Sequence, residues 1–154
     1  TMNREILFRG KNPNGEWVSG DLILVIEEEP HIFYKTQEDI INERISNETV
    51  VKETVGQYTG LTDKNGNKIF EGDILHLTIP DGSIRHFVVE WANRNRLLMP
   101  LSGFNHDGNA IRISGWCFNW KGNRLYPSVI DGAPDNKRMQ VVGNIHDTPD
   151  LLKG

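Results

Sequence analysis

The central stretch of the chain, from Glu53 to Ile74, reads ETVGQYTGLTDKNGNKIFEGDI. Short runs of β-branched and aromatic residues flank its Asn65-Gly66 pair, which is the pattern of a β-hairpin. Its other glycines permit a bend or a close approach of two backbones, and Gly72-Asp73 begins the next strand. We therefore predict architectural roles, not reactive ones, for the key residues of this stretch, which are Gly56, Gln57, Tyr58, Gly60, Asn65, Gly66, Gly72 and Asp73.

Turn signals of the same kind recur along the chain, which contains 15 glycines and 7 prolines. Hairpin-type pairs occur at Asn14-Gly15, Asn65-Gly66, Asp81-Gly82, Asp107-Gly108 and Asp131-Gly132. The runs that we predict to be strands are 22–26, 54–59, 74–79, 87–91, 110–113 and 139–142. Short strands with frequent turns predict a mostly β fold, either a small antiparallel barrel or a strongly bent sheet. Asn14-Gly15 and Asn65-Gly66 are both followed by a Gly-Asp pair, which we interpret as shared turn chemistry.

The predicted strands and turns leave few residues for helices. The best candidate is 36–44, where Thr36 precedes Asp39 by three positions, as at a capped helix start. The consecutive isoleucines at 40 and 41 suit a strand as well. The tail, 147–152, contains Pro149 and predicts a single helical turn. We therefore expect one or two short helices.

The stretch Ile79-Pro80-Asp81-Gly82-Ser83 predicts a three-residue hairpin loop that pairs Ile79 with Ser83. In this register Leu75 faces Phe87, and His76 lies directly opposite His86. The predicted core face consists of Leu75, Leu77, Ile79, Phe87, Val89 and Trp91. The other face holds Ile74, Thr78, Ile84, Val88 and Glu90 beside the two histidines.

Composition indicates one globular domain, 1–154, with 37% hydrophobic and 25% charged residues and a net charge of -4. Thr1, which precedes Met2, is expected to be foreign to the natural chain. The single cysteine, Cys117, excludes a disulfide framework and a zinc site built on cysteine pairs. The single cysteine fits a reducing compartment and no signal-like segment is present, so we expect a cytoplasmic protein. No apolar run is long enough to span a membrane, so we expect no membrane partner.

The central stretch closely resembles the YopX family of small bacteriophage and prophage proteins. Arg9-Gly10 with GEWVSGDL (15–22) is similar to the family's opening, and VGNIHDTPDLL (142–152) to its close. The resemblance covers nearly the whole chain except 92–138. It implies a mostly β protein made in the bacterial cytoplasm, and it implies no activity, cofactor or catalytic residue. SH3-like elements are a further expectation, by analogy of fold alone.

Charge is unevenly distributed along the chain. Residues 91–130 contain five basic residues and one acid, Asp107, for a net charge of +4, whereas the rest carries -8. The same stretch holds the aromatics Trp91, Phe104, Trp116, Phe118, Trp120 and Tyr126. Stacking aromatics beside cations suit single-stranded nucleic acid. The residues predicted for this role are Arg94, Arg96, Arg112, Trp116, Phe118, Trp120, Lys121 and Arg124. The aromatics equally suit a core or a subunit interface.

The facing histidines, His76 and His86, suit half of a transition-metal site. A catalytic zinc usually has three protein ligands, and neither His106 nor His146 can be placed beside the pair from the sequence. The alternative is that both are partly exposed residues of a polar sheet face.

Signatures of common enzymes are absent from the sequence, which has no G-x-S-x-G, P-loop, H-E-x-x-H or G-x-G-x-x-G. Cys117 between two aromatics is predicted to be a buried apolar residue, and Asp21 and Asp73 to be turn residues instead of paired carboxylates. Glu27-Glu28-Glu29 is expected to be a solvated loop. We therefore expect a phage accessory protein that binds a host or phage protein without catalysis and without a cofactor. Homo-oligomers are plausible, because sheet edges need cover.

Overall fold

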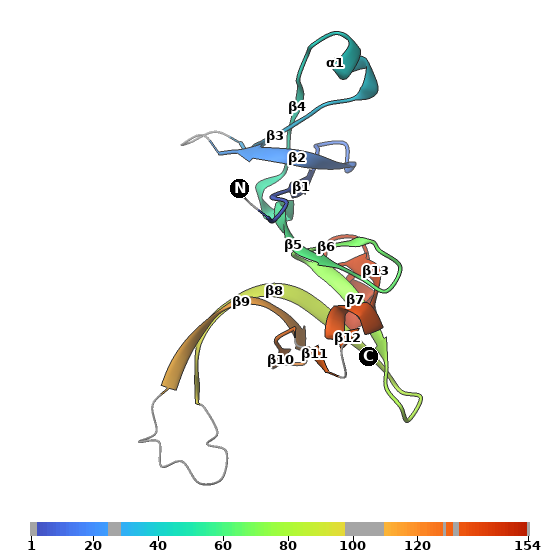
Figure 1. The fold of residues 1–154 in the computed structure, drawn as a ribbon. Coiled ribbons are helices and arrows are strands. Elements are labelled where there is room, and N and C mark those ends of the chain that lie inside the picture. The colour runs from blue at the N-terminus through green and yellow to red at the C-terminus, as the bar shows by residue number, and fades with distance from the viewer. Residues whose placement is uncertain (1–2, 25–28, 98–109, 128, 131–132, 154) are drawn as a thin grey trace.

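The computed structural model describes residues 3–24, 29–97, 110–127, 129–130 and 133–153, and for 94–97, 110–113, 129–130 and 133 it describes the backbone alone. The chain forms two large antiparallel sheets and one small one (Figure 1). The predictions for residues 25–28, Phe104, His106, Asp107-Gly108 and Asp131-Gly132 lie outside the described residues. Within the described part of the chain, no helix has the length and apolar character that a membrane span requires.

The first sheet is built from the N-terminal hairpin and the central stretch. Its strands are β1 (Phe8–Lys11), β2 (Trp17–Ile23), β3 (His31–Tyr34), β4 (Ser46–Thr49), β5 (Gly56–Thr62) and β6 (Lys68–Phe70). They lie in the order β4-β3-β2-β1-β5-β6, and each neighbouring pair is antiparallel. The 3₁₀ turn η1 (Lys52–Thr54) leads into β5.

The second sheet has five strands, and its two longest form one hairpin. The strands are β7 (Asp73–Thr78), β8 (Ile84–Leu97), β9 (Ala110–Trp120), β10 (Asn123–Leu125) and β13 (Gln140–Asn144). Their order is β10-β9-β8-β7-β13. A separate small ladder pairs β11 (Val129–Ile130) with β12 (Ala133–Pro134), and η2 (Asp135–Arg138) and η3 (Pro149–Leu152) are 3₁₀ turns.

The predicted helix is confirmed as α1 (Gln37–Ile41), between β3 and β4. The Thr36 hydroxyl accepts a hydrogen bond from the Asp39 backbone N–H at 3.1 Å, and the Asp39 carboxylate accepts one from the Thr36 N–H at 2.9 Å. This reciprocal cap is what the spacing predicts. The helix ends earlier than predicted, because Glu43 takes a left-handed conformation with φ of 54°. The tail turn is confirmed as η3.

Three hairpins use the same five-residue turn, namely residues 12–16, 63–67 and 79–83. In each, the first N–H donates to the carbonyl oxygen of the fifth residue, at 2.8–2.9 Å. The fourth residue is the glycine with positive φ that this turn requires, as predicted for Gly82. The turn fixes the register, so the predicted pairings of Leu75 with Phe87 and of His76 with His86 are confirmed.

The core lies between the β5–β6 hairpin and one face of the second sheet. Its buried members are Ile69, Leu75, Phe87, Val89, Phe118 and Met139. The predicted core face is thus confirmed for Leu75, Phe87 and Val89. Trp91 was predicted on this face too, yet it is 52% exposed. It stands beyond Val88, the last β8 residue that pairs with β7, so less of the sheet lies beside it.

The mostly β class is confirmed, but the predicted barrel and SH3-like elements are not. In the described ladders neither large sheet closes on itself, since β4 and β6 are the edges of the first sheet and β10 and β13 the edges of the second. Figure 1 shows β8 and β9 curving strongly away from the rest of the second sheet.

Candidate functional site

The β8–β9 hairpin extends beyond the sheet that carries it. The two strands pair from Val88–Asn119 to Leu97–Ala110. β7 pairs with β8 only as far as Val88, and β10 pairs with β9 only as far as Phe118. The outer part, residues 91–97 and 110–116, therefore has only two strands in the described ladder, and we name it the ribbon (Figure 1).

Three predicted nucleic-acid residues lie together on this ribbon. Arg94 pairs with Ile113, Arg112 with Asn95, and Arg96 with Ile111. These are consecutive rungs, so the three backbone positions lie within about 7 Å along the ribbon. The ribbon sequences, WANRNRL and AIRISGW, contain no acidic residue. The backbone thus places three arginines on consecutive rungs of a two-stranded arm.

The predicted aromatic residues share one strand face, but this face packs mainly against the core. Phe118 is 0% exposed, and Trp116 and Trp120 pack partly buried around it. The Arg85 guanidinium lies 4.2 Å from the Trp120 ring centroid. Trp91 is the exposed aromatic here, and its ring meets Trp116 edge-on at 5.1 Å. Phe118 therefore cannot stack on a base while the protein is folded.

The structure separates Arg124 from the ribbon arginines. Arg124 Nε donates to Glu90 Oε1 at 2.6 Å, and Asn119 Nδ2 donates to the other carboxylate oxygen at 3.2 Å. The neighbouring Cys117 is buried, and burial raises the pKa of its thiol to about 11. The prediction that Cys117 is buried is confirmed, since it is 0% exposed, and its Sγ donates to Glu90 Oε1 at 3.7 Å.

Lys121 lies in the turn between β9 and β10. Trp120 pairs with Asn123, and the two residues between them have positive φ, 48° for Lys121 and 86° for Gly122. This is a type I′ turn, in which Asn, Asp or Gly is the usual first central residue. This hairpin was not predicted from the sequence, because a Lys-Gly pair is a weak turn signal.

The facing histidines have hydrogen-bond partners of their own. Their ring centroids are 5.5 Å apart. His86 Nδ1 donates to the Leu151 carbonyl oxygen at 3.0 Å, and His76 Nε2 is bonded to Thr78 Oγ1 at 3.2 Å. Burial, and then the nearby His86 and Lys64, lower the pKa of His76.

No third ligand joins this pair in the part of the chain that the structure describes, where no group of three His, Cys, Asp or Glu residues is placed to hold a metal ion. His146 lies elsewhere, with its ring 5.9 Å from that of Trp17.

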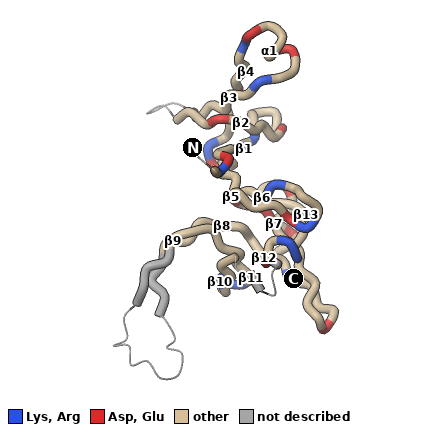
Figure 2. The backbone as a smooth tube through the Cα atoms, in the orientation of Figure 1, with Lys and Arg blue, Asp and Glu red and all other residues tan. Residues whose placement is uncertain are grey.

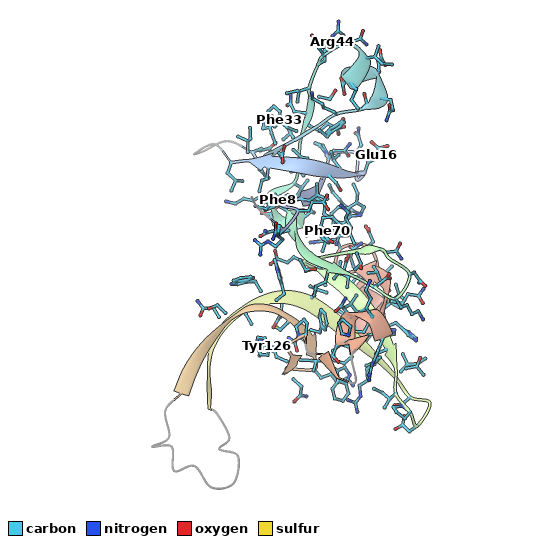
Figure 3. The ribbon with its side chains drawn as sticks, in the orientation of Figure 1. Phe8, Glu16, Phe33, Arg44, Phe70 and Tyr126 are labelled. Carbon is cyan, nitrogen blue, oxygen red and sulfur yellow. The ribbon has the colours of Figure 1, made fainter. Side chains whose placement is uncertain are left out.

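The Gly-Asp pair of the central stretch is part of a buried joint. Arg9 Nη2 donates to Asp73 Oδ1 at 2.6 Å, and the two side chains are 14% and 1% exposed. The Phe70 N–H donates to the other Asp73 oxygen at 2.7 Å. The guanidinium lies 4.6 Å from the Trp17 ring and 4.8 Å from the Phe70 ring, which Figure 3 labels. Burial raises the pKa of Asp73, and the charge of Arg9 opposes that rise.

The C-terminal segment joins the same region through Asp147. Its carboxylate accepts hydrogen bonds from Lys11 Nζ, from Trp17 Nε1 at 2.7 Å and from Asn144 Nδ2 at 2.8 Å. These bonds hold the pKa of Asp147 well below its ordinary value. The N-terminal, central and C-terminal blocks therefore meet in space. No prediction from the sequence placed these blocks beside one another.

The other residues of the central stretch have structural partners as well. The Gln57 carbonyl oxygen accepts from the Glu71 N–H at 2.9 Å, and the Tyr58 and Phe70 rings lie 5.6 Å apart. A Cβ on Gly56 would lie 2.8 Å from the Glu71 carbonyl oxygen. Asp21 is exposed on the first sheet, so it forms no carboxylate pair with the buried Asp73.

These observations define a two-sheet antiparallel β protein with a basic ribbon and a polar joint between its terminal segments and its central stretch. The family model described as YopX protein matches residues 7–153, and the chain belongs to the YopX family. No curated protein matches the chain.

The solved structures that are similar to the chain include the crystal structure of protein EF1440 from Enterococcus faecalis. It is 20% identical and matches 97% of this chain and 99% of its own, with a TM-score of 0.48.

Proposed function

We propose that this protein acts by binding, without catalysis, and that the ribbon binds nucleic acid, with double-stranded DNA as the preferred form. The observation that carries the proposal is the placement of Arg94, Arg96 and Arg112 on three consecutive rungs of an acid-free, two-stranded arm.

Shape and charge support duplex DNA as the ligand. The major groove of B-DNA is about 12 Å wide and admits a two-stranded ribbon, whereas the deep, narrow major groove of A-form RNA does not. Arginine donates to phosphates and to the guanine edge. Since the chain as a whole carries -4, the attraction must be local, and the ribbon is where positive charge is concentrated.

Single-stranded nucleic acid is the second candidate. It requires accessible aromatic faces, and of the ring residues near the ribbon Phe118 is buried while Trp116 and Trp120 pack against the core. Trp91, with its exposed ring, is the observation that keeps this candidate open.

The state of the ionisable groups supports a role without catalysis. The buried carboxylates of Asp63 and Asp73 are each held by partners from within the chain. A metal-dependent activity of His76 and His86 has no further support from a neighbouring ligand in the described residues. A phage or prophage origin, a place in the bacterial cytoplasm, a host or phage protein partner and homo-oligomers stay predictions.

The test is fluorescence anisotropy with a labelled 20-base-pair DNA duplex and with one of its single strands, each at low and at high salt. The variant Arg94→Gln/Arg96→Gln/Arg112→Gln is compared with Lys35→Gln/Arg44→Gln/Lys52→Gln. Both remove three positive charges, but the second set lies away from the ribbon. Lys35 and Arg44 flank α1, where Figure 2 shows acidic and basic residues interspersed, and Lys52 begins η1.

We expect the wild-type protein to bind the duplex more tightly than the single strand, and to lose affinity as salt is added. The ribbon variant should bind the duplex roughly 10- to 100-fold more weakly, and the control variant within about twofold of wild type. No binding at low salt, or equal losses in the two variants, would end the proposal. A pull-down from host lysate with and without nuclease then separates a nucleic-acid partner from a protein one.

A further inference from the structure

A groove of about 350 Å³ lies on the side of the second sheet that faces away from the core. β8 contributes Ile84 and Val88 to its lining, and η3 contributes Leu151 and Leu152. Ile84 is 57% and Leu152 37% exposed, so both side chains leave apolar surface open to solvent. The volume is at the lower end for ligand pockets, which suits a small ligand.

One wall of this groove is held in place by a hydrogen bond. His86 lines the groove, and its Nδ1 donates to the Leu151 carbonyl oxygen at 3.0 Å. This bond ties η3 to β8 and so fixes Leu151 beside the β8 residues of the lining. A preformed apolar site binds a ligand without the entropic cost of ordering its walls.

The positive charge of the groove comes from Lys121, which also lines it. Its left-handed backbone, with φ of 48°, is unfavourable for lysine and easy for asparagine or glycine. The turn itself therefore does not require a lysine. Among the residues that the structure describes, no carboxylate lines the groove or forms an ion pair with Lys121. An unneutralised cation beside an apolar surface matches a ligand with one negative group and an apolar body.

We propose that this groove binds a small amphiphilic carboxylate. Its aliphatic chain lies on Ile84, Val88, Leu151 and Leu152, and its carboxylate accepts a hydrogen bond from the Lys121 ammonium group. The site is separate from the ribbon, so this proposal stands or falls independently of nucleic-acid binding.

The test is an NMR titration of the full chain with octanoate, at concentrations below micelle formation. The signals followed are the Gly122 amide and the methyl groups of Leu151 and Leu152. The variant Lys121→Asn removes the charge and eases the turn, so its thermal midpoint should not fall. Lys35→Asn, on the exposed segment before α1, is the matched control.

We expect saturable shifts at these signals, with an affinity at least fivefold weaker in Lys121→Asn and unchanged in Lys35→Asn. Octanol, which lacks the carboxylate, should bind the wild-type groove at least fivefold more weakly than octanoate. The proposal is overturned by an absence of saturable shifts, by equal binding of octanoate and octanol, or by full affinity in Lys121→Asn. Shifts spread over exposed residues such as Ile41 and Ile45 would overturn it too, because they indicate unspecific binding.

Discussion

Asp63 shows what a buried carboxylate does in this molecule. It is 0% exposed, and its Oδ1 accepts from the Asn65 and Asn67 N–H groups at 2.8 and 2.9 Å. Its Oδ2 accepts from Asn67 Nδ2 at 3.1 Å and from the Val141 N–H at 3.0 Å. Burial alone would raise the pKa of Asp63, but these bonds outweigh it and lower the pKa. The residue shapes the β5–β6 turn and fastens it to β13.

We predict that Asp63→Asn lowers the free energy of unfolding by about 3 kcal/mol, because the new amide cannot accept from all four donors that the buried carboxylate satisfies. Asp21→Asn, on the exposed side of β2, should change it by less than about 0.5 kcal/mol. Urea denaturation of the two variants and the wild type measures both values. Similar losses in both variants would contradict the assigned role of Asp63.

At the scale of elements, turn chemistry could be predicted and long-range pairing could not. Ile79-Pro80-Asp81-Gly82-Ser83 fixes its own register, since Gly82 supplies the positive φ that this loop needs. The pairing of β1 with β5 joins Phe8 to Gln57, and no local signal in the sequence encodes it. Sequence order likewise gave no sign that β8 and β9 continue past their neighbours as a ribbon.

The candidate site was also predictable only in part, because the local sequence does not show which distant residues come together. The excess of positive charge in 91–130 is visible in the sequence. The sequence does not show which of the basic residues lie on the ribbon and which form ion pairs. The ladder gathers Arg94, Arg96 and Arg112, whereas Arg124 pairs with Glu90. Alternation along a strand predicted that Trp116, Phe118 and Trp120 share a face. It could not say that this face packs against the core, because the β5–β6 hairpin that covers it lies far away in sequence.

The histidine pair gives a prediction for one element. His86→Phe removes the donor to the Leu151 carbonyl oxygen, whereas His76→Phe removes only a bond within β7. We expect the η3 amides of Leu151 and Lys153 to exchange with deuterium about fivefold faster in His86→Phe, since one hydrogen bond contributes about 1 kcal/mol. In His76→Phe they should exchange as in wild type. Equal exchange in both variants would show that His86 does not hold this turn.

For the whole molecule, the polar joint links chain segments that are far apart in sequence. Asp147 reaches Lys11 and Trp17 of the first sheet, and Arg9 reaches Asp73 of the second. These links predict a dependence of stability on pH. Asp147 and Asp63 have pKa values below the ordinary 3.8, so they bind fewer protons when folded than when unfolded. Their stabilising effect is complete above that pH and is lost as the pH falls toward their folded pKa values.

Asp73 and Glu71 act in the opposite direction, because burial raises their pKa values and folding then favours their protonated forms. Carboxyl groups with lowered pKa values outnumber those with raised values, since Asp39, Glu48 and Asp81 also have lowered pKa values. His76 and His146 also have pKa values below the ordinary 6.5, so we predict that the free energy of unfolding begins to fall below about pH 6.5 and falls more steeply below about pH 4. Asp147→Asn should make the fall below pH 4 shallower. Urea denaturation from pH 7 to pH 2 tests it. Asp150→Asn controls for the loss of one negative charge, and a profile of Asp147→Asn that parallels wild type would contradict the prediction.

DNA binding by the ribbon arginines is tested by the salt dependence of duplex binding, measured for wild type and for Arg94→Gln/Arg96→Gln/Arg112→Gln. A plot of the logarithm of affinity against the logarithm of salt concentration reports the phosphates neutralised, with a slope of about -0.9 for each. If the ribbon arginines contact the DNA backbone, the triple variant should have a slope shallower by about 2 to 3. An unchanged slope would place the contact elsewhere on the molecule and contradict the account.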